Sequence, residues 1–109
     1  MPWETRILIE SPERHPSAKD IPTVAETVLP GYVAIAWNGF VAPKGTPTDI
    51  VARLNAETIR AMAAPEITAK FAALSAVSRP LSPEAFRSFI KDETSKWGEV
   101  VRISGAKID

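Results

Sequence analysis

The stretch of sequence that decides the expected fold is DIPTVAETVLPGYVAIAWNGFVAPKGTPTDIV, residues 20–51. Its centre, Tyr32 to Ala42, is an apolar run in which alanine and valine occupy both alternating faces. A strand that is apolar on both faces is typical of a sheet covered on both sides. The run therefore predicts a buried strand over residues 32–42.

Trp37, Asn38 and Gly39 interrupt this predicted strand at its middle. Both Asn and Gly weaken a strand, and they commonly mark a bulge or a bend. A second interpretation is that the backbone crosses here between two lobes and comes close to a ligand or a second domain. Spacing alone favours the bulge or bend and leaves the second interpretation open.

Two further short strands are expected, at residues 6–10 and 77–80, where apolar residues lie between polar or proline-rich loops. A short helix is expected from Val24 to about Val28. Thr23 is a suitable N-cap for it, and Glu26, three residues later, completes a capping-box pattern.

Three longer helices follow from apolar residues at helical spacing. Each begins where a proline can occupy the first turn, as in the pairs Thr46-Pro47, Ala64-Pro65 and Ser82-Pro83. Thr46 is the expected N-cap of the first of these helices. We expect the last helix to end at Gly105. The expected helices cover residues 47–63, 65–75 and 83–104. Together with the strands they predict an α/β fold with a short sheet, in a single domain over residues 1–109.

The composition excludes several classes of protein. The 109 residues include 13 Lys and Arg against 13 Asp and Glu, which lacks the basic excess of a nucleic-acid binder. Cysteine is absent, so disulfides and thiolate metal sites are excluded. The first fifteen residues contain an early acidic residue and no apolar core, so the sequence as written is expected to lack a signal peptide.

Residues that would carry catalysis are not grouped in this sequence. His15 is the only histidine, and it lies in a polar, proline-flanked loop without a neighbouring partner for base catalysis. Asp92 and Glu93 are adjacent, so on a helix they point about 100° apart and form no carboxylate pair. Phosphate-binding glycine loops are also missing. We expect no enzyme activity, no cofactor and no metal site.

Several motifs resemble the Bug family of extracytoplasmic solute receptors, the substrate-binding components of tripartite tricarboxylate transporters. In that family an Arg-x-Pro loop precedes the first of them. The motifs present here are DIPTVAE (20–26), PGY (30–32), WNGF (37–40), APKGTP (42–47), SPEAF (82–86) and KWGEVV (96–101). They occur in order over nearly the whole chain.

The resemblance implies a two-lobed, periplasmic-binding-protein-like receptor that closes on a small carboxylate by hinge motion. It also implies membrane transporter subunits as partners and a periplasmic location. Under this resemblance Thr23, Trp37, Asn38 and Gly39 are the candidate ligand-binding residues. Pro22 and Glu26 are expected to be structural.

The family is much longer, and this sequence resembles its C-terminal portion only. Three interpretations follow. The chain is part of a carboxylate receptor, or a stand-alone remnant that self-associates as a homodimer without binding ligand, or a small enzyme, which the missing catalytic groups disfavour. The isolated chain is expected to bind carboxylates weakly or not at all. If it is the complete product, its location would be cytoplasmic.

Overall fold

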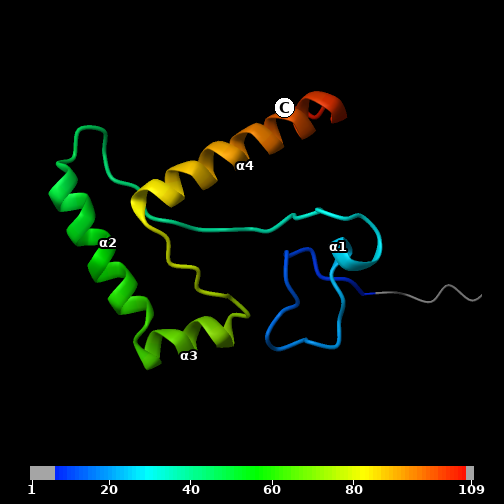
Figure 1. Cartoon of the computed structure of the whole chain (residues 1–109), viewed down its shortest axis with the longest axis horizontal. Coiled ribbons are helices and arrows are strands. Elements are labelled where there is room, and N and C mark those ends of the chain that lie inside the picture. Colours follow the sequence, from blue (N-terminus) through cyan, green and yellow to red (C-terminus); the bar gives the residue numbers. More distant parts are fainter. Residues whose placement is uncertain (1–6, 108–109) are drawn as a thin grey trace, which may run out of the picture. The chain divides into compact units, whose positions relative to one another are not determined.

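The computed structural model describes residues 7–107. The chain divides between Val41 and Ala42 into two compact units, which are described separately here. The first contains α1 (Val24–Thr27), and the second contains α2 (Thr48–Met62), α3 (Pro65–Ala73) and α4 (Pro83–Ser104). Figure 1 shows these helices in order along the chain.

The first unit is organised around α1 and the loop that precedes it. The backbone N–H of Ile9 donates to the carbonyl of Pro22 at 3.0 Å, and Val24 N–H donates to the carbonyl of Ile9 at 2.9 Å. These two bonds form an isolated parallel bridge between Ile9 and Thr23. The bridge closes residues 10–22 into a loop whose end is the N-terminus of α1.

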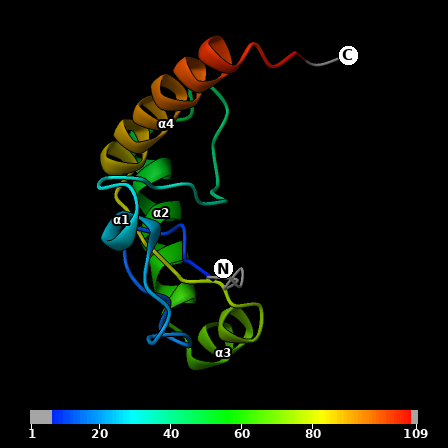
Figure 2. The ribbon, with the colours of Figure 1, turned by 90° about the vertical axis from the view of Figure 1, so that its right-hand side faces the viewer.

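The second unit is helical. α2 contacts both α3 and α4 (Figures 1 and 2). A side-chain amide reinforces this arrangement, because Asn55 Nδ2 on α2 donates to the carbonyl of Leu81 at 2.9 Å, just before α4. The predicted helices 47–63, 65–75 and 83–104 are confirmed to within two residues at each end.

Local capping chemistry explains both ends of α4. Ser82 Oγ accepts the N–H of Ala85 at 3.1 Å and caps α4, whose C-cap Gly105 has a φ of 66°. Left-handed backbone of this kind is favourable for glycine because it has no Cβ. The assignment of Thr46 as the N-cap of α2 was wrong. Pro47 is the cap residue, and the Thr46 hydroxyl donates instead to the carbonyl of Pro43 at 2.8 Å.

The prediction of an α/β fold with a short sheet was wrong. Within residues 7–107 the structure contains helices and the single bridge at Ile9, and no strand ladder. Residues 32–42 run extended without a neighbouring strand, and residues 77–80 are irregular. The first predicted strand, 6–10, begins outside the described residues and contributes only Ile9 to the bridge.

The physical reason is that a continuous apolar run indicates a tendency to be buried, whereas a strand also needs a hydrogen-bonded neighbour. In the segment 33–41, the N–H of Ala34 donates to the carbonyl of Glu10 at 3.0 Å. Beyond it Phe40 and Val41 are 86% and 81% exposed. The described part of the chain offers no second strand with which this segment forms a sheet.

The described residues also lack an apolar core. None of their hydrophobic side chains is fully buried, and the only fully buried residue among them is Thr23. The amphipathic pattern of the helices is therefore present without complete cover for its apolar side.

Candidate functional site

Thr23 is the most deeply buried of the four predicted site residues, with 1% of its surface exposed. Its Oγ1 accepts the backbone N–H of Glu26 at 3.1 Å, while the Glu26 carboxylate accepts the backbone N–H of Thr23 at 2.7 Å. This reciprocal pair is the capping box expected from the sequence. The Thr27 hydroxyl adds a bond to the carbonyl of Thr23 at 2.9 Å.

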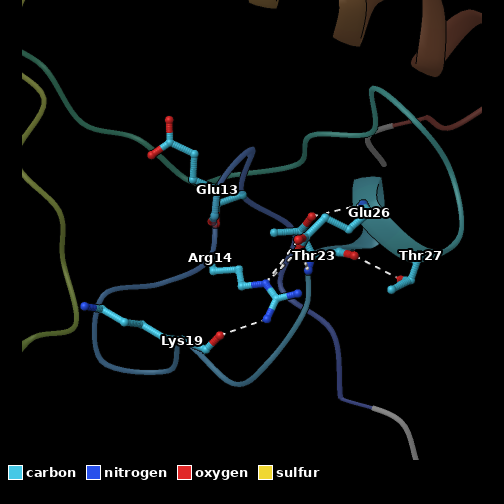
Figure 3. Close-up of polar contacts among 7 residues, drawn as sticks. Glu13, Arg14, Lys19, Thr23, Glu26 and Thr27 are labelled. Carbon is cyan, nitrogen blue, oxygen red and sulfur yellow. Dashed lines mark hydrogen bonds and ion pairs between the residues drawn. The ribbon is translucent and has the colours of Figure 1, made fainter.

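Arg14 pairs with the same carboxylate (Figure 3). Its Nε lies 3.1 and 3.0 Å from the two oxygens of Glu26, and its Nη1 donates to the carbonyl of Lys19 at 3.0 Å. The Arg14 guanidinium therefore bonds both to Glu26 on α1 and to the carbonyl of Lys19 in the preceding loop. We call Arg14, Thr23 and Glu26 the loop latch.

The electrostatics of the loop latch favour the ionised carboxylate. The hydrogen bond from Arg14, followed by the backbone hydrogen bond from Thr23, lowers the pKa of Glu26 to about 2. The same contact with Glu26 raises the pKa of Arg14 above its ordinary value. Both groups are charged at neutral pH and form an ion pair.

The other three predicted site residues lie in the extended segment that follows. Trp37, Asn38 and Gly39 are all exposed. Asn38 and Gly39 make no hydrogen bond or ion pair to the rest of residues 7–107. The structure thus joins Thr23 to the loop latch but does not gather the four residues into one polar site, and their role in ligand binding stays a prediction.

Sequence reasoning missed Arg14, although the signal was available. Arg14, His15 and Pro16 form an Arg-x-Pro sequence, and the acidic partner of Arg14 lies twelve residues later in the DIPTVAE motif. Separation in sequence hid this pairing, because the intervening loop has no periodicity from which a contact can be read.

Residues 7–107 offer neither a metal site nor a membrane-spanning helix. Among residues 7–107 no three His, Cys, Asp or Glu side chains are grouped as metal ligands would be. No described helix combines the length and apolar character needed to cross a bilayer. An apolar hollow lies beside the loop latch, lined by Ile7, Leu8, Pro22, Thr27 and Val28.

Comparison with known proteins places these features in a family. Residues 5–106 match the model of the tripartite tricarboxylate transporter family receptor, TctC. The chain belongs to this family. The match confirms the predicted resemblance, and the family is one of transport receptors rather than a class of enzymes.

Two curated relatives support the assignment. A protein described as the UPF0065 protein in the tcbD-tcbE intergenic region of Pseudomonas sp. strain P51 is 38% identical over 94 residues, which are 85% of this chain and 28% of that relative. Protein BugT of Bordetella pertussis strain Tohama I is 36% identical over 102 residues, or 94% of this chain and 31% of BugT. The chain therefore spans less than a third of the length of either relative.

The structure explains what two of the family-like motifs do locally. DIPTVAE supplies the cap and the carboxylate of the loop latch. APKGTP forms a turn in which Gly45 has a φ of 88° and the N–H of Thr46 donates to the carbonyl of Pro43. Only glycine takes this conformation without strain. Both motifs therefore have a local structural role among the described residues.

Proposed function

We propose that this chain is the C-terminal portion of a periplasmic solute receptor that binds a small carboxylate for tripartite transport. The observation that carries the proposal is the family match over residues 5–106. On this proposal residues 1–109 act as one domain of the receptor, whose partners are a di- or tricarboxylate and membrane transporter subunits. It is a binding protein without catalytic activity or a cofactor.

The candidate contacts to the carboxylate are Thr23, Trp37, Asn38 and Gly39. The exposed amide of Asn38 and the backbone N–H groups of this segment are donors that match a carboxylate. The hydroxyl oxygen of Thr23 is already engaged within the loop latch, where it accepts the N–H of Glu26. A neutral donor set is consistent with the absence of a basic excess in the sequence.

A chimeric receptor tests this function. The region of BugT that matches this chain is replaced by the 102 matched residues, and the folded chimera is heated with each member of a panel of di- and tricarboxylates. A ligand at 100 times its Kd stabilises the folded state by about 2.7 kcal/mol. We expect one acid to raise the melting temperature and Asn38→Ala to weaken that effect. A folded chimera that no acid stabilises contradicts the proposal.

The isolated chain is expected to bind the same acids weakly or not at all, since a site shared with other parts of a receptor loses most of its contacts. Saturable micromolar binding in a calorimetric titration would contradict this expectation. The competing candidate is a self-associating homodimer without ligand binding. The exposed side chains of Phe40 and Val41 are the observation that favours it.

A further inference from the structure

Asn38 and Gly39 form the single Asn-Gly pair of the sequence. Both residues are exposed, and they lie in the extended segment 33–41, which has no neighbouring strand within residues 7–107. Neither residue makes a hydrogen bond or an ion pair to the rest of the described chain. The side-chain amide of Asn38 and the backbone N–H of Gly39 are therefore adjacent, and both are open to water.

An amide and a backbone nitrogen placed in this way can react with each other. The nitrogen of Gly39 attacks Cγ of Asn38, and a succinimide ring closes as the Cγ–Nδ2 bond breaks. The proton of the Gly39 N–H leaves with the departing NH2 group as ammonia. Water then opens the ring at one of its carbonyl carbons and leaves either an aspartyl or an isoaspartyl residue at position 38. The net reaction consumes water and releases ammonia, without an oxidant or a reductant.

Three properties of the segment favour this reaction. The two reacting groups belong to neighbouring residues, so the attack is intramolecular and needs no encounter. Glycine has no Cβ to crowd the approach of its nitrogen to Cγ. The backbone must also rotate to bring the nitrogen to the side chain, and no ladder of hydrogen bonds opposes that rotation between residues 33 and 41.

Asn55 is the only other side-chain amide, since the sequence contains no glutamine. It lies inside α2, and its Nδ2 donates to the carbonyl of Leu81 at 2.9 Å. The following nitrogen, that of Ala56, is held by the hydrogen-bond pattern of the helix. The structure therefore leaves one side-chain amide of the chain in a reactive setting and holds the other in place.

We propose that Asn38 is a site of spontaneous deamidation through a succinimide with Gly39, and that the carboxylate it creates weakens binding of a carboxylate ligand at this segment. The second part rests on the proposed function, in which Asn38 is a contact to the ligand. An ionised aspartyl side chain only accepts hydrogen bonds, so the amide donor is lost. Its negative charge also repels a ligand of the same sign.

The first experiment follows the 109-residue chain in mildly alkaline buffer by intact mass and by peptide mapping. We expect NH2 to be replaced by OH at position 38, as a mixture of aspartyl and isoaspartyl products, while Asn55 stays unchanged. Gly39→Ala should leave most chains unmodified at the time when most parent chains have reacted, because the added methyl group crowds the nitrogen. An Asn38 that persists, an Asn55 that reacts equally fast, or a Gly39→Ala variant that reacts like the parent would overturn the proposal.

A matched control separates the structure from the dipeptide. Ala56→Gly creates a second Asn-Gly pair, this time inside α2. We expect that pair to persist in buffer while Asn38 reacts, because the helix holds its backbone nitrogen. In urea, where the helix is lost, the two rates should converge. Equal rates in buffer would show that the dipeptide alone decides the reaction, and would overturn the structural argument.

The BugT chimera tests the effect on binding. We expect the acid that raises the melting temperature of the parent chimera to give no such rise in Asn38→Asp. Equal stabilisation of the two would overturn the effect on binding and leave the proposed function standing. If no acid stabilises the parent chimera, the proposed function and the effect on binding both fail, whereas deamidation measured in the 109-residue chain stands by itself.

Discussion

Arg14 Nε lies 3.1 and 3.0 Å from the two carboxylate oxygens of Glu26, twelve residues further along the chain. The same carboxylate accepts the backbone N–H of Thr23, so the ion pair and the helix cap share one side chain. The loop between Arg14 and Thr23 is consequently held at both ends by a polar cluster, in a unit whose described residues include no fully buried apolar side chain.

The cap at Thr23 is expected to be the most sensitive single position of α1. Thr23→Ala removes the oxygen that accepts the Glu26 N–H and should cost about 0.5–2 kcal/mol of local stability. Thr23→Ser retains that oxygen and should cost less. Amide exchange at Glu26 checks the prediction, and it is contradicted if the serine variant exchanges as fast as the alanine variant.

Acid should release the loop latch. The pKa of Glu26 is lowered from 4.5 to about 2, so its contribution to stability is fully present above pH 4.5 and is lost as the pH falls through 2. Titration of the Glu26 carboxyl carbon by NMR measures this directly. In Arg14→Gln the pKa should rise toward 4.5, because the largest cause of the shift has been removed. An unchanged pKa in that variant would show that Arg14 does not pair with Glu26 in solution.

Gly98 inside α4 and Gly105 at its C-cap should respond to alanine in opposite directions. Gly105 has a φ of 66°, where a Cβ meets no other atom but strains the backbone, so Gly105→Ala should destabilise the helix end by about 1–2 kcal/mol. Gly98 lies inside α4 and also faces open space, so Gly98→Ala should stabilise the helix by about 0.5–1 kcal/mol. Circular dichroism melting of the two variants provides the comparison. Changes of the same sign would contradict the left-handed cap.

The bond from Asn55 to the carbonyl of Leu81 should matter for the contact between α2 and the start of α4. Asn55→Asp removes the donor at nearly constant shape, and a hydrogen bond of this kind contributes about 0.5–1.5 kcal/mol. We expect the chemical shift of Leu81 to move toward its value in an unstructured peptide. Arg53→Ala, at an exposed position of α2, is the control. Equal shifts at Leu81 in the two variants would exclude the bond.

The helices and their ends could be predicted from the sequence because their determinants are local. The spacing of apolar residues, the capping box at Thr23 and Glu26, the cap at Ser82 and the glycine at position 105 all act within a few residues of one another. The family, too, follows from short motifs in order along the chain, and the family match confirms it.

Whether a sheet forms could not be predicted from local sequence. Tyr32 to Ala42 has the composition of a buried strand, but whether it becomes one depends on neighbours distant in sequence, and the described residues provide none. The same limit hid the pairing of Arg14 with Glu26 and of Asn55 with Leu81. Sequence by itself determined where this chain is helical, where its helices end and which family it resembles, because those properties arise from neighbouring residues. Only the tertiary structure decided which side chains meet, which are buried and which apolar faces remain in water, because those properties depend on contacts between distant parts of the chain.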